Sequence, residues 1–184
     1  MVPTRKPTTS TATTTTFEAP RPFAFALGAN LGDARTTIGA AIDRIAARWG
    51  PLAVAPLYRT EPVSPIAQPD FLNTVVLGAT RAAPEELLAF ARELEARLGR
   101  TPRQRDAPRE IDIDLLFVGD LVRASPRFTL PHPRLRERRF VLAPLADLAP
   151  DLPLPPDGET VAGLLARLPG GQRVERLTPA GAAP

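Results

Sequence analysis

The order of its strand-like and helix-like patterns most constrains how this chain can fold. The short apolar run Phe23–Gly28 indicates a buried strand. Apolar residues three or four positions apart then predict a helix over Ala34–Arg48. Two further strands are expected over Leu52–Thr60 and Phe71–Thr80, with a proline-rich loop between them. The first half of the pattern is therefore strand, helix, strand, strand.

A second helix and a fourth strand complete the pattern. Pro84 at a first-turn position and Gly99 after the last turn delimit the helix. Strict alternation at the start of the next apolar segment predicts a strand whose one face carries Ile111, Ile113, Leu115 and Phe117. Strand, helix, strand, strand, helix, strand is the order of a ferredoxin-like α+β sandwich, an antiparallel sheet with helices packed on one face.

One domain is expected over residues 22–169, with two further helices at its C-terminal end and a tail on either side. Helices near Arg138–Ala146 and Thr160–Leu168 are the predicted C-terminal additions. Residues 1–21 are rich in threonine and proline and have few large apolar side chains to bury, which predicts a disordered extension. By composition, residues 170–184 are expected to form a flexible tail.

Composition removes several classes of chemistry. The absence of cysteine excludes disulfides, thiol nucleophiles and cysteine zinc sites, and suits a reducing compartment such as the cytoplasm. The only lysine, Lys6, lies in the extension, so the domain has neither a P-loop lysine nor Schiff-base chemistry. One histidine excludes an HExxH metalloprotease site, and no apolar run approaches the roughly 18 residues of a membrane span.

The formal net charge of +3 raises the alternative of a basic RNA-binding domain on the same sandwich. In that hypothesis the arginines would contact a phosphate backbone. Only 5% of the residues are aromatic, and the sequence has no aromatic run on which bases could stack. The RNA-binding alternative has weak support but stays open at this point.

Asp112 and Asp114 are the sharpest candidates for chemistry. They are separated by one apolar residue in a predicted strand, so both side chains lie on the same face, with Cα atoms roughly 6.6 Å apart. Two carboxylates placed in this way can share a pair of Mg²⁺ ions. The alternative is that the two acids only form the solvated face of an edge strand.

The surroundings of the two aspartates favour a polyphosphate site. An arginine-rich segment, Arg100–Arg109, precedes them and is predicted to be an exposed, mobile loop. His132 follows between two prolines, with further arginines around it. Arginine binds phosphate through a planar fork of donors, so it can replace the missing lysine. Asn73 is a polar amide on an apolar strand, which either faces water or binds a ligand.

Five motifs in order carry a resemblance to a known family. They are ALGANLGD (26–33), LYRTEPV (57–63), QPDFLN (68–73), APREIDIDLL (107–116) and LPHPRLRERRFVLAPL (130–145). The sequence resembles the 6-hydroxymethyl-7,8-dihydropterin pyrophosphokinases over about residues 23–168. That resemblance implies transfer of the pyrophosphoryl group of ATP to the pterin hydroxymethyl oxygen, with release of AMP. It also implies a ferredoxin-like monomer that uses two Mg²⁺ ions and binds neither nucleic acid nor membrane.

The resemblance assigns roles to particular residues. Asp112 and Asp114 match the aspartates that bind the metal ions, and with Arg100 and Arg109 they are the expected catalytic residues. The residues that match the pterin pocket are Thr60, Val63, Phe71, Asn73, Asp112 and Phe140. The residues that match positions in contact with ATP are Glu95, Arg100, Arg109, Leu115, Arg127, Thr129, His132 and Arg138.

The chain also departs from the family pattern. Asp106, Ala107 and Pro108 stand where many members have Trp-Gly-Pro, and Arg103 matches a family arginine only across a gap. Pro133 follows the histidine where some members have tyrosine. A catalytically silent relative that only binds its ligands is a further alternative, against which the intact Asp112 and Asn73 speak.

Overall fold

The computed structural model describes residues 19–101, 104 and 106–178. An antiparallel sheet forms its centre, with the strand order β10-β3-β4-β1-β5, and the short β2 also pairs with β4. The strands are β1 (Arg21–Ala29), β2 (Ala53–Val54), β3 (Tyr58–Thr60), β4 (Phe71–Thr80), β5 (Asp112–Val118) and β10 (Val174–Arg176). The predicted α+β sandwich is confirmed.

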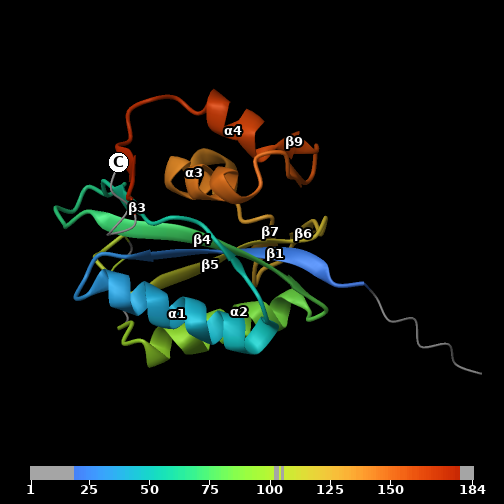
Figure 1. Cartoon of the computed structure of the whole chain (residues 1–184), viewed down its shortest axis with the longest axis horizontal. Helices are drawn as coiled ribbons and strands as arrows, with labels where there is room; N and C mark the ends of the chain where they lie inside the picture. Colours follow the sequence, from blue (N-terminus) through green and yellow to red (C-terminus); the bar gives the residue numbers. More distant parts are fainter. Residues whose placement is uncertain (1–18, 102–103, 105, 179–184) are drawn as a thin grey trace, which may run out of the picture.

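Helices cover both faces of this sheet (Figure 1). The two longer ones, α1 (Ala34–Trp49) and α2 (Pro84–Arg97), pack on one face, as the sequence predicts. On the other face lie α3 (Arg139–Leu148) and α4 (Val161–Arg167), which enclose a second apolar core. The expectation of helices on one face is therefore incomplete, because the C-terminal helices carry enough apolar residues to cover the opposite face.

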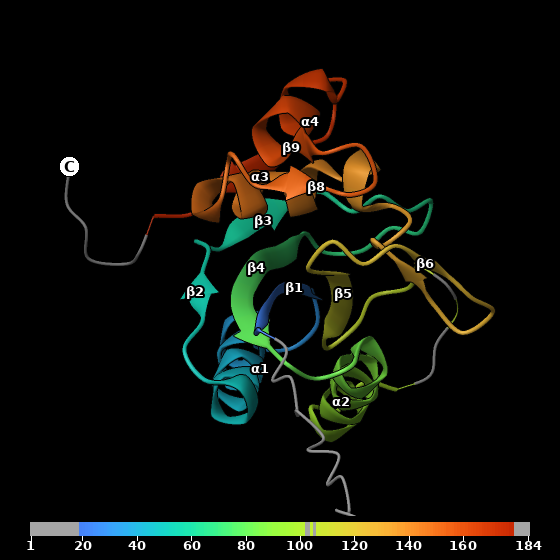
Figure 2. The same ribbon diagram turned by 90° about the vertical axis from the view of Figure 1, so that its right-hand side faces the viewer.

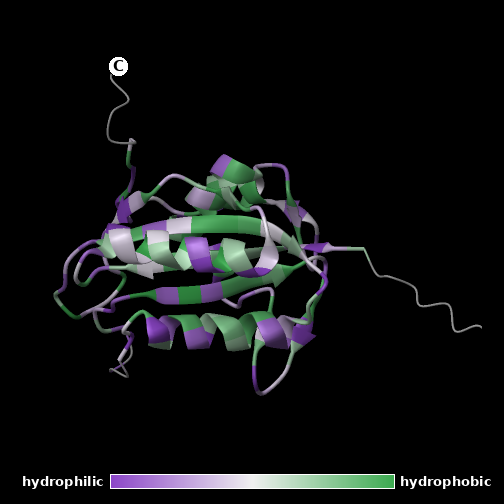
Figure 3. Ribbon diagram, turned by 60° about the horizontal axis from the view of Figure 1, so that its bottom comes forward, coloured by the Kyte–Doolittle hydropathy of each residue, from purple (hydrophilic) through white to green (hydrophobic). Residues whose placement is uncertain are grey.

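Local sequence explains where the two longer helices begin and end. The Asp33 side chain accepts a hydrogen bond from the Thr36 backbone N–H and so caps α1. Gly50 follows α1 with a φ of 87°, a left-handed conformation that glycine adopts without strain. Helix α2 starts at Pro84, and its buried stripe includes Leu87, Ala91 and Leu94. Purple outer and green inner positions on these helices show the same amphipathic pattern (Figure 3).

Strand β5 contains a β-bulge that changes which side chains face which core. Phe25 pairs with Leu115, whereas its neighbour Ala24 pairs with Phe117, so Leu116 is the extra residue. Beyond the bulge, Phe117 lies in the core under α3 together with Leu116. The prediction that Phe117 shares a face with Ile111, Ile113 and Leu115 is wrong for this reason. Asp112 and Asp114 precede the bulge and keep the predicted alternation.

Two other expected segments differ from the structure at the edge of the sheet. The strand predicted over Leu52–Thr60 is split into β2 and β3, and Pro56, which has no N–H to donate to the ladder, lies in the gap. Residues after Gly170 were expected to be unstructured, but β10 pairs with the exposed edge of β3. Pairing with a preformed edge supplies hydrogen bonds that the composition of the tail does not reveal.

The remaining elements are short: three lie between β5 and α3, and a two-stranded hairpin joins α3 to α4 (Figure 2). They are β6 (Arg123–Ala124), β7 (Thr129–Leu130), the 3-10 turn η1 (Leu135–Glu137), β8 (Pro153–Leu154) and β9 (Glu159–Thr160). Strand β1 already begins at Arg21, inside the predicted 1–21 extension, and residues 1–18 lie outside the described part. Within the described ranges, no helix has the length and apolar character needed to cross a bilayer.

Candidate active site

The register of three neighbouring strands places the key polar residues in one row. Gly28 of β1 pairs with Asn73 of β4 on one side and with Asp112 of β5 on the other. One step along, Ala26 pairs with Asp114. Directly paired residues lie on the same face of a sheet, and here that face carries α3. Because β1 contributes only glycine and alanine to this row, space remains between the sheet and the C-terminal layer.

That space is a cavity of about 220 Å³, which we call the pterin hollow in view of the residues expected there. All six residues matched to the pterin pocket line it: Thr60, Val63, Phe71, Asn73, Asp112 and Phe140. They come from β3, the loop after it, β4, β5 and α3. The structure thus brings together residues that are up to eighty positions apart in the chain.

Asn73 is held in this hollow by its neighbours. Its side chain is buried, and its Nδ2 donates a hydrogen bond of 2.6 Å to the Thr60 Oγ1. A Cβ atom at position 28 would lie 2.5 Å from the Asn73 Oδ1. Gly28 is therefore required for Asn73 to lie flat against the strand beside it.

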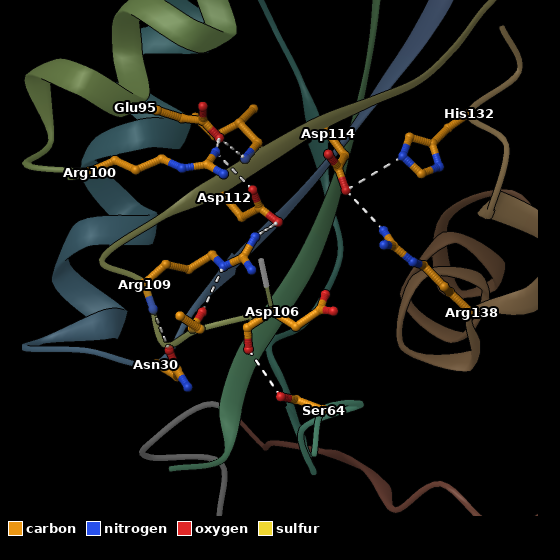
Figure 4. A network of polar contacts seen from close by, with 12 residues as sticks. Asn30, Ser64, Glu95, Arg100, Asp106, Arg109, Asp112, Asp114, His132 and Arg138 are labelled. Atoms are coloured by element: carbon orange, nitrogen blue, oxygen red, sulfur yellow. Dashed lines mark hydrogen bonds and ion pairs between the residues drawn. The ribbon is translucent and has the colours of Figure 1, made fainter. Parts of the chain in front are cut away.

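Arginine side chains pair with both aspartates (Figure 4). The Asp112 carboxylate contacts Arg109 Nη1 at 2.8 Å through one oxygen and Arg100 Nη1 at 2.9 Å through the other. The Asp114 Oδ2 lies 2.9 Å from Arg138 Nη1 and 3.8 Å from the His132 Nε2. The four sequence-predicted catalytic residues therefore lie in two neighbouring groups, one around Asp112 and one around Asp114, on the same face of β5.

Burial shifts the proton affinities within these two groups. It raises the pKa of Asp112, and the charge of Asp114 acts in the same direction, while Arg109 and Arg100 oppose both. It lowers the pKa of His132, although the nearby Asp114 charge partly offsets this. The imidazole of the free protein is therefore neutral at pH 7 and has one N–H to donate.

A second hollow of about 280 Å³ adjoins the first, and we call it the phosphate hollow. Among the described residues that line it are Arg100, Arg109, His132 and Arg138, four of the residues matched to ATP contacts. Asp112 and Asp114 line both hollows, and so does Arg134, one of the arginines near His132. The two aspartates thus stand on the boundary between them.

The other residues matched to ATP contacts lie elsewhere. Glu95 is buried beneath the cluster, where its Oε1 accepts a 2.7 Å hydrogen bond from the Ile113 N–H and pairs with Arg100. Leu115 belongs to the core under α1 and α2, on the face opposite the aspartates. Arg127 and Thr129 are exposed on the β6–β7 hairpin and are not among the described residues that line either hollow. Arg103 lies outside the described residues.

Polar contacts join the loops around the site. Asn30 and Gln68 take part in them, although neither is among the sequence-predicted site residues. The Asn30 side chain donates to Gln68 Oε1 at 2.9 Å and accepts from the Arg109 N–H at 2.8 Å. Gln68 Nε2 and Ser64 Oγ both donate to the backbone carbonyl of Asp106, at 2.9 and 3.1 Å. Asn30 and Gln68 belong to two of the five family motifs, 26–33 and 68–73, and this is the only feature of the sequence that indicates a role for them.

The donor set fits magnesium carried by a nucleotide. Within the described residues, no group of three or more His, Cys, Asp or Glu side chains could hold a metal ion by itself. Mg²⁺ is commonly bound by one or two carboxylates together with substrate phosphates and water, rather than by a complete protein cage. Asp112 and Asp114 provide that partial set next to the phosphate hollow.

Comparisons with known proteins agree with this geometry. A family model described as 7,8-dihydro-6-hydroxymethylpterin-pyrophosphokinase (HPPK) matches residues 24–150. The 2-amino-4-hydroxy-6-hydroxymethyldihydropteridine pyrophosphokinase of Pseudomonas aeruginosa is 42% identical over 154 residues, which cover 83% of this chain and 94% of that protein. The enzyme of the same name from Methylorubrum extorquens is 43% identical over 153 residues, or 81% and 96% of the two chains.

The chain is also similar to one part of longer proteins. The mitochondrial folate synthesis bifunctional protein of Arabidopsis thaliana is 41% identical over 91% of this chain, which spans 31% of the plant protein. A crystal structure of Plasmodium falciparum HPPK-DHPS with pterin and p-hydroxybenzoate superposes with a TM-score of 0.66 at 14% identity. That match covers 83% of this chain and 44% of the crystallised one, and at such low identity it supports the fold alone.

Proposed function

Because this chain belongs to the 7,8-dihydro-6-hydroxymethylpterin-pyrophosphokinase family, we propose that its two adjoining hollows bind the pterin and the phosphates of ATP. The enzyme transfers the pyrophosphoryl group of ATP to 6-hydroxymethyl-7,8-dihydropterin in folate biosynthesis, releasing AMP. The observation that carries the site assignment is the row Asn73, Gly28, Asp112, which joins the pterin hollow to the phosphate hollow. The RNA-binding alternative has no support from the comparisons.

In the pterin hollow, flat and polar surfaces lie where a heteroaromatic ring needs them. Phe71 and Phe140 would stack on the two faces of the ring, and Asn73 would hydrogen-bond its polar edge. Arg138 lies with its guanidinium 5.4 Å from the centre of the Phe140 ring, so the residue that pairs with Asp114 also supports one wall. This contact couples the stacking residue to the acidic cluster.

In the phosphate hollow, the arginines are the main proposed ligands of the ATP phosphates. Phosphoryl transfer leaves little covalent chemistry for the protein, so positioning and charge stabilisation dominate. Arg100 and Arg109 exchange Asp112 for phosphate oxygens when ATP enters, and the neutral His132 donates its N–H to a phosphate. Glu95 acts as the buried anchor that keeps Arg100 directed at this hollow.

The aspartates released by the arginines are the proposed magnesium ligands. The family uses ATP with Mg²⁺, and we propose two ions, held by Asp112 and Asp114 together with the phosphates. When bound there, the ions supply positive charge that polarises the phosphate oxygens and lowers the pKa of the pterin hydroxyl.

The oligomeric state of the enzyme and its place in the cell are also open to proposal. In line with the family resemblance, we propose a monomer that acts on two small substrates without nucleic acid or membrane. The cysteine-free sequence supports a reducing, cytoplasmic setting. Light scattering with size-exclusion chromatography tests the first statement, and cell fractionation tests the second.

The decisive experiment resolves the nucleotides formed from MgATP and 6-hydroxymethyl-7,8-dihydropterin by chromatography. AMP should form only when the pterin and Mg²⁺ are both present. Asp112→Ala and Asp114→Ala should each abolish most of the activity while leaving the circular dichroism spectrum unchanged. Asp43→Ala, which alters an exposed aspartate of α1, is the matched control and should turn over normally.

Two outcomes would contradict these assignments separately. Formation of ADP in place of AMP would overturn pyrophosphoryl transfer by this chain. Near-normal turnover of Asp112→Ala or Asp114→Ala, with AMP still formed, would overturn the metal site and leave the reaction intact.

A further inference from the structure

The segment that follows α4 reaches back to the pterin hollow. We define residues 172–176 as the C-terminal strap; they comprise Gln172, Arg173 and strand β10. Figure 1 shows this red segment running from α4 to the edge of the sheet beside β3. The strap lies beyond residues 24–150, the range that matches the family model. The match to the family model therefore does not describe its contacts.

The strap is fixed along the strand that carries one wall of the hollow. Val174 pairs with Thr60, whose hydroxyl receives the hydrogen bond from Asn73. The Glu61 N–H donates to the Arg173 carbonyl at 3.2 Å, and the Leu177 N–H donates to the Leu57 carbonyl at 2.8 Å. Backbone hydrogen bonds thus hold the strap on both sides of its pairing with Thr60.

Arg173 contacts both ends of the loop between β3 and β4, residues 61–70, through its backbone N–H at one end and its side chain at the other. The Arg173 N–H donates to the Glu61 carboxylate at 2.8 Å, and the Arg173 guanidinium contacts both oxygens of Asp70, at 3.0 and 2.9 Å. Asp70 directly precedes Phe71, the proposed stacking residue. Glu61 and Asp70 are the two ends of the loop, so one arginine fixes both ends.

The strap also reaches the hollow itself and its opposite wall. Gln172 lines the pterin hollow, and its Nε2 donates to the Glu61 carbonyl at 3.3 Å. At the other end, Arg176 Nε donates to the Asp147 carboxylate of α3 at 3.0 Å. Tyr58 of β3 donates its hydroxyl to the same carboxylate oxygen at 2.8 Å. Phe140 lies on α3, so the strap contacts the helix that bears one proposed stacking residue and, through Asp70, the residue that precedes the other.

We propose that the C-terminal strap is part of the pterin site, with Arg173 as the positioning residue that holds the 61–70 loop and Gln172 as a wall of the hollow. Arg173 touches no substrate in this proposal and acts through Asp70 and Glu61. Its loss would let the loop move away from the ring, which weakens pterin binding and leaves the phosphate hollow unchanged. The inference rests on the proposed assignment of this hollow to the pterin.

The test is a charge reversal with its compensating partner. Arg173→Asp places a carboxylate against Asp70 and keeps the backbone N–H that contacts Glu61. The KM for the pterin should therefore rise about fivefold, as expected for an exposed pair converted from attraction to repulsion. The kcat and the KM for ATP should change less than about twofold. The double variant with Asp70→Arg should restore most of the pterin KM, a rescue that a general loss of stability would not produce.

Arg167→Asp is the matched control. Arg167 is an exposed arginine of α4 that pairs with Glu159, away from both hollows, so its reversal should leave the pterin KM unchanged. A pterin KM for Arg173→Asp within twofold of the unaltered enzyme, or equal losses in kcat and in ATP affinity, would overturn the proposal.

Asn73→Ala separates failure of the strap from failure of the pocket. Calorimetry should show strongly reduced pterin binding for this variant if the hollow binds the pterin. Weak binding by Asn73→Ala together with normal binding by Arg173→Asp would reject the strap alone. Normal pterin binding by both variants would reject the pocket assignment and the strap with it.

Discussion

Asp112 is the residue on which the two hollows depend together. It lies in the row with Gly28 and Asn73, lines the pterin hollow, and is held by Arg100 and Arg109 from the phosphate side. In the proposed site, this position puts its carboxylate beside the place where the pterin oxygen would meet the phosphorus. Burial and the charge of Asp114 raise the pKa of Asp112, and the charges of Arg109 and Arg100 act against this rise.

His132 offers a direct measurement, because it is the only histidine of the chain. Burial lowers its pKa below the ordinary value of about 6.5, so its proton NMR signals should titrate with a midpoint below that value. Bound MgATP should move the midpoint upward, since a phosphate favours the imidazolium. A midpoint at or above 6.5 in the free protein would contradict the neutral form described above.

The same shift has a consequence for stability. The unfolded chain takes up a proton on this histidine at higher pH than the folded chain does. The free energy of unfolding should therefore fall as the pH falls from about 6.5 through the lower folded midpoint. Denaturant titrations of His132→Asn should show a smaller decline over that window.

Gly28→Ala should damage the pterin site through one atom. The new Cβ would lie 2.5 Å from the Asn73 Oδ1, so Asn73 must rotate and give up its bond to Thr60. Loss of such a buried hydrogen bond costs about 1–3 kcal/mol, and pterin affinity should fall at least about tenfold. Calorimetry and thermal melting measure the two effects.

Gly39→Ala is the control for that substitution. Position 39 lies in α1, and no atom would come within 4 Å of its Cβ. Alanine in a helix is favoured over glycine by about 1 kcal/mol, so this variant should be slightly stabilised and bind pterin normally. Pterin binding by Gly28→Ala equal to that of Gly39→Ala would contradict the close approach of Gly28 to Asn73.

At the scale of elements, Tyr58 reports on how β3, α3 and the strap fit together. Burial raises its pKa to about 12, and the hydrogen bond to Asp147 and the charge of that carboxylate act in the same direction. Tyr58 is the only tyrosine, so absorbance at alkaline pH reads it directly. The transition should lie near 12 in the folded protein, and Asp147→Asn should lower it.

The raised pKa of Tyr58 makes the free energy of unfolding depend on pH in the alkaline range. The contribution of Tyr58 is fully present below the ordinary tyrosine pKa of about 10 and is lost as the pH rises from there to about 12. An absorbance transition near 10 in folded protein would show that the phenol is not held against α3.

Elements with strong local signals were predictable from the sequence, and the others depended on tertiary partners. Helix α2 has its proline, its apolar stripe and its terminal glycine, and its predicted bounds agree with the structure to within one residue. The pattern of β5 predicts the face of Asp112 and Asp114 but not the bulge at Leu116, because a bulge depends on the partner strand. Strand β10 consists of three residues whose pairing depends on the free edge of β3.

The candidate site shows the same division. The six residues expected in the pterin pocket do meet around one hollow, because motif residues on three neighbouring strands are fixed by register. The ATP contacts of Glu95 and Leu115 stay predictions, because both side chains are buried and neither is among the described residues that line the hollows. Gln172 carried no signal, because it enters the site only through the pairing of β10.

For the whole molecule, ligand binding and folding should be coupled. A ligand that binds only the folded state stabilises it by about 2.7 kcal/mol at about 100 times its Kd. MgATP should therefore raise the Tm of the protein by several degrees, and ATP without Mg²⁺ should raise it less. Asp114→Ala should lose most of the magnesium-dependent part, and an undiminished magnesium effect in this variant would contradict the proposed ligand set.

The acidic and basic side chains of the site also serve as counterions to one another. The carboxylates of Glu95, Asp112 and Asp114 are matched in number by the guanidinium groups of Arg100, Arg109 and Arg138. In the proposed site, ATP and its cations would therefore enter by exchange of counterions within this group of six described side chains, whose charges sum to zero. Added salt screens a neutral cluster little at a distance, so the association rate of MgATP should depend only weakly on ionic strength.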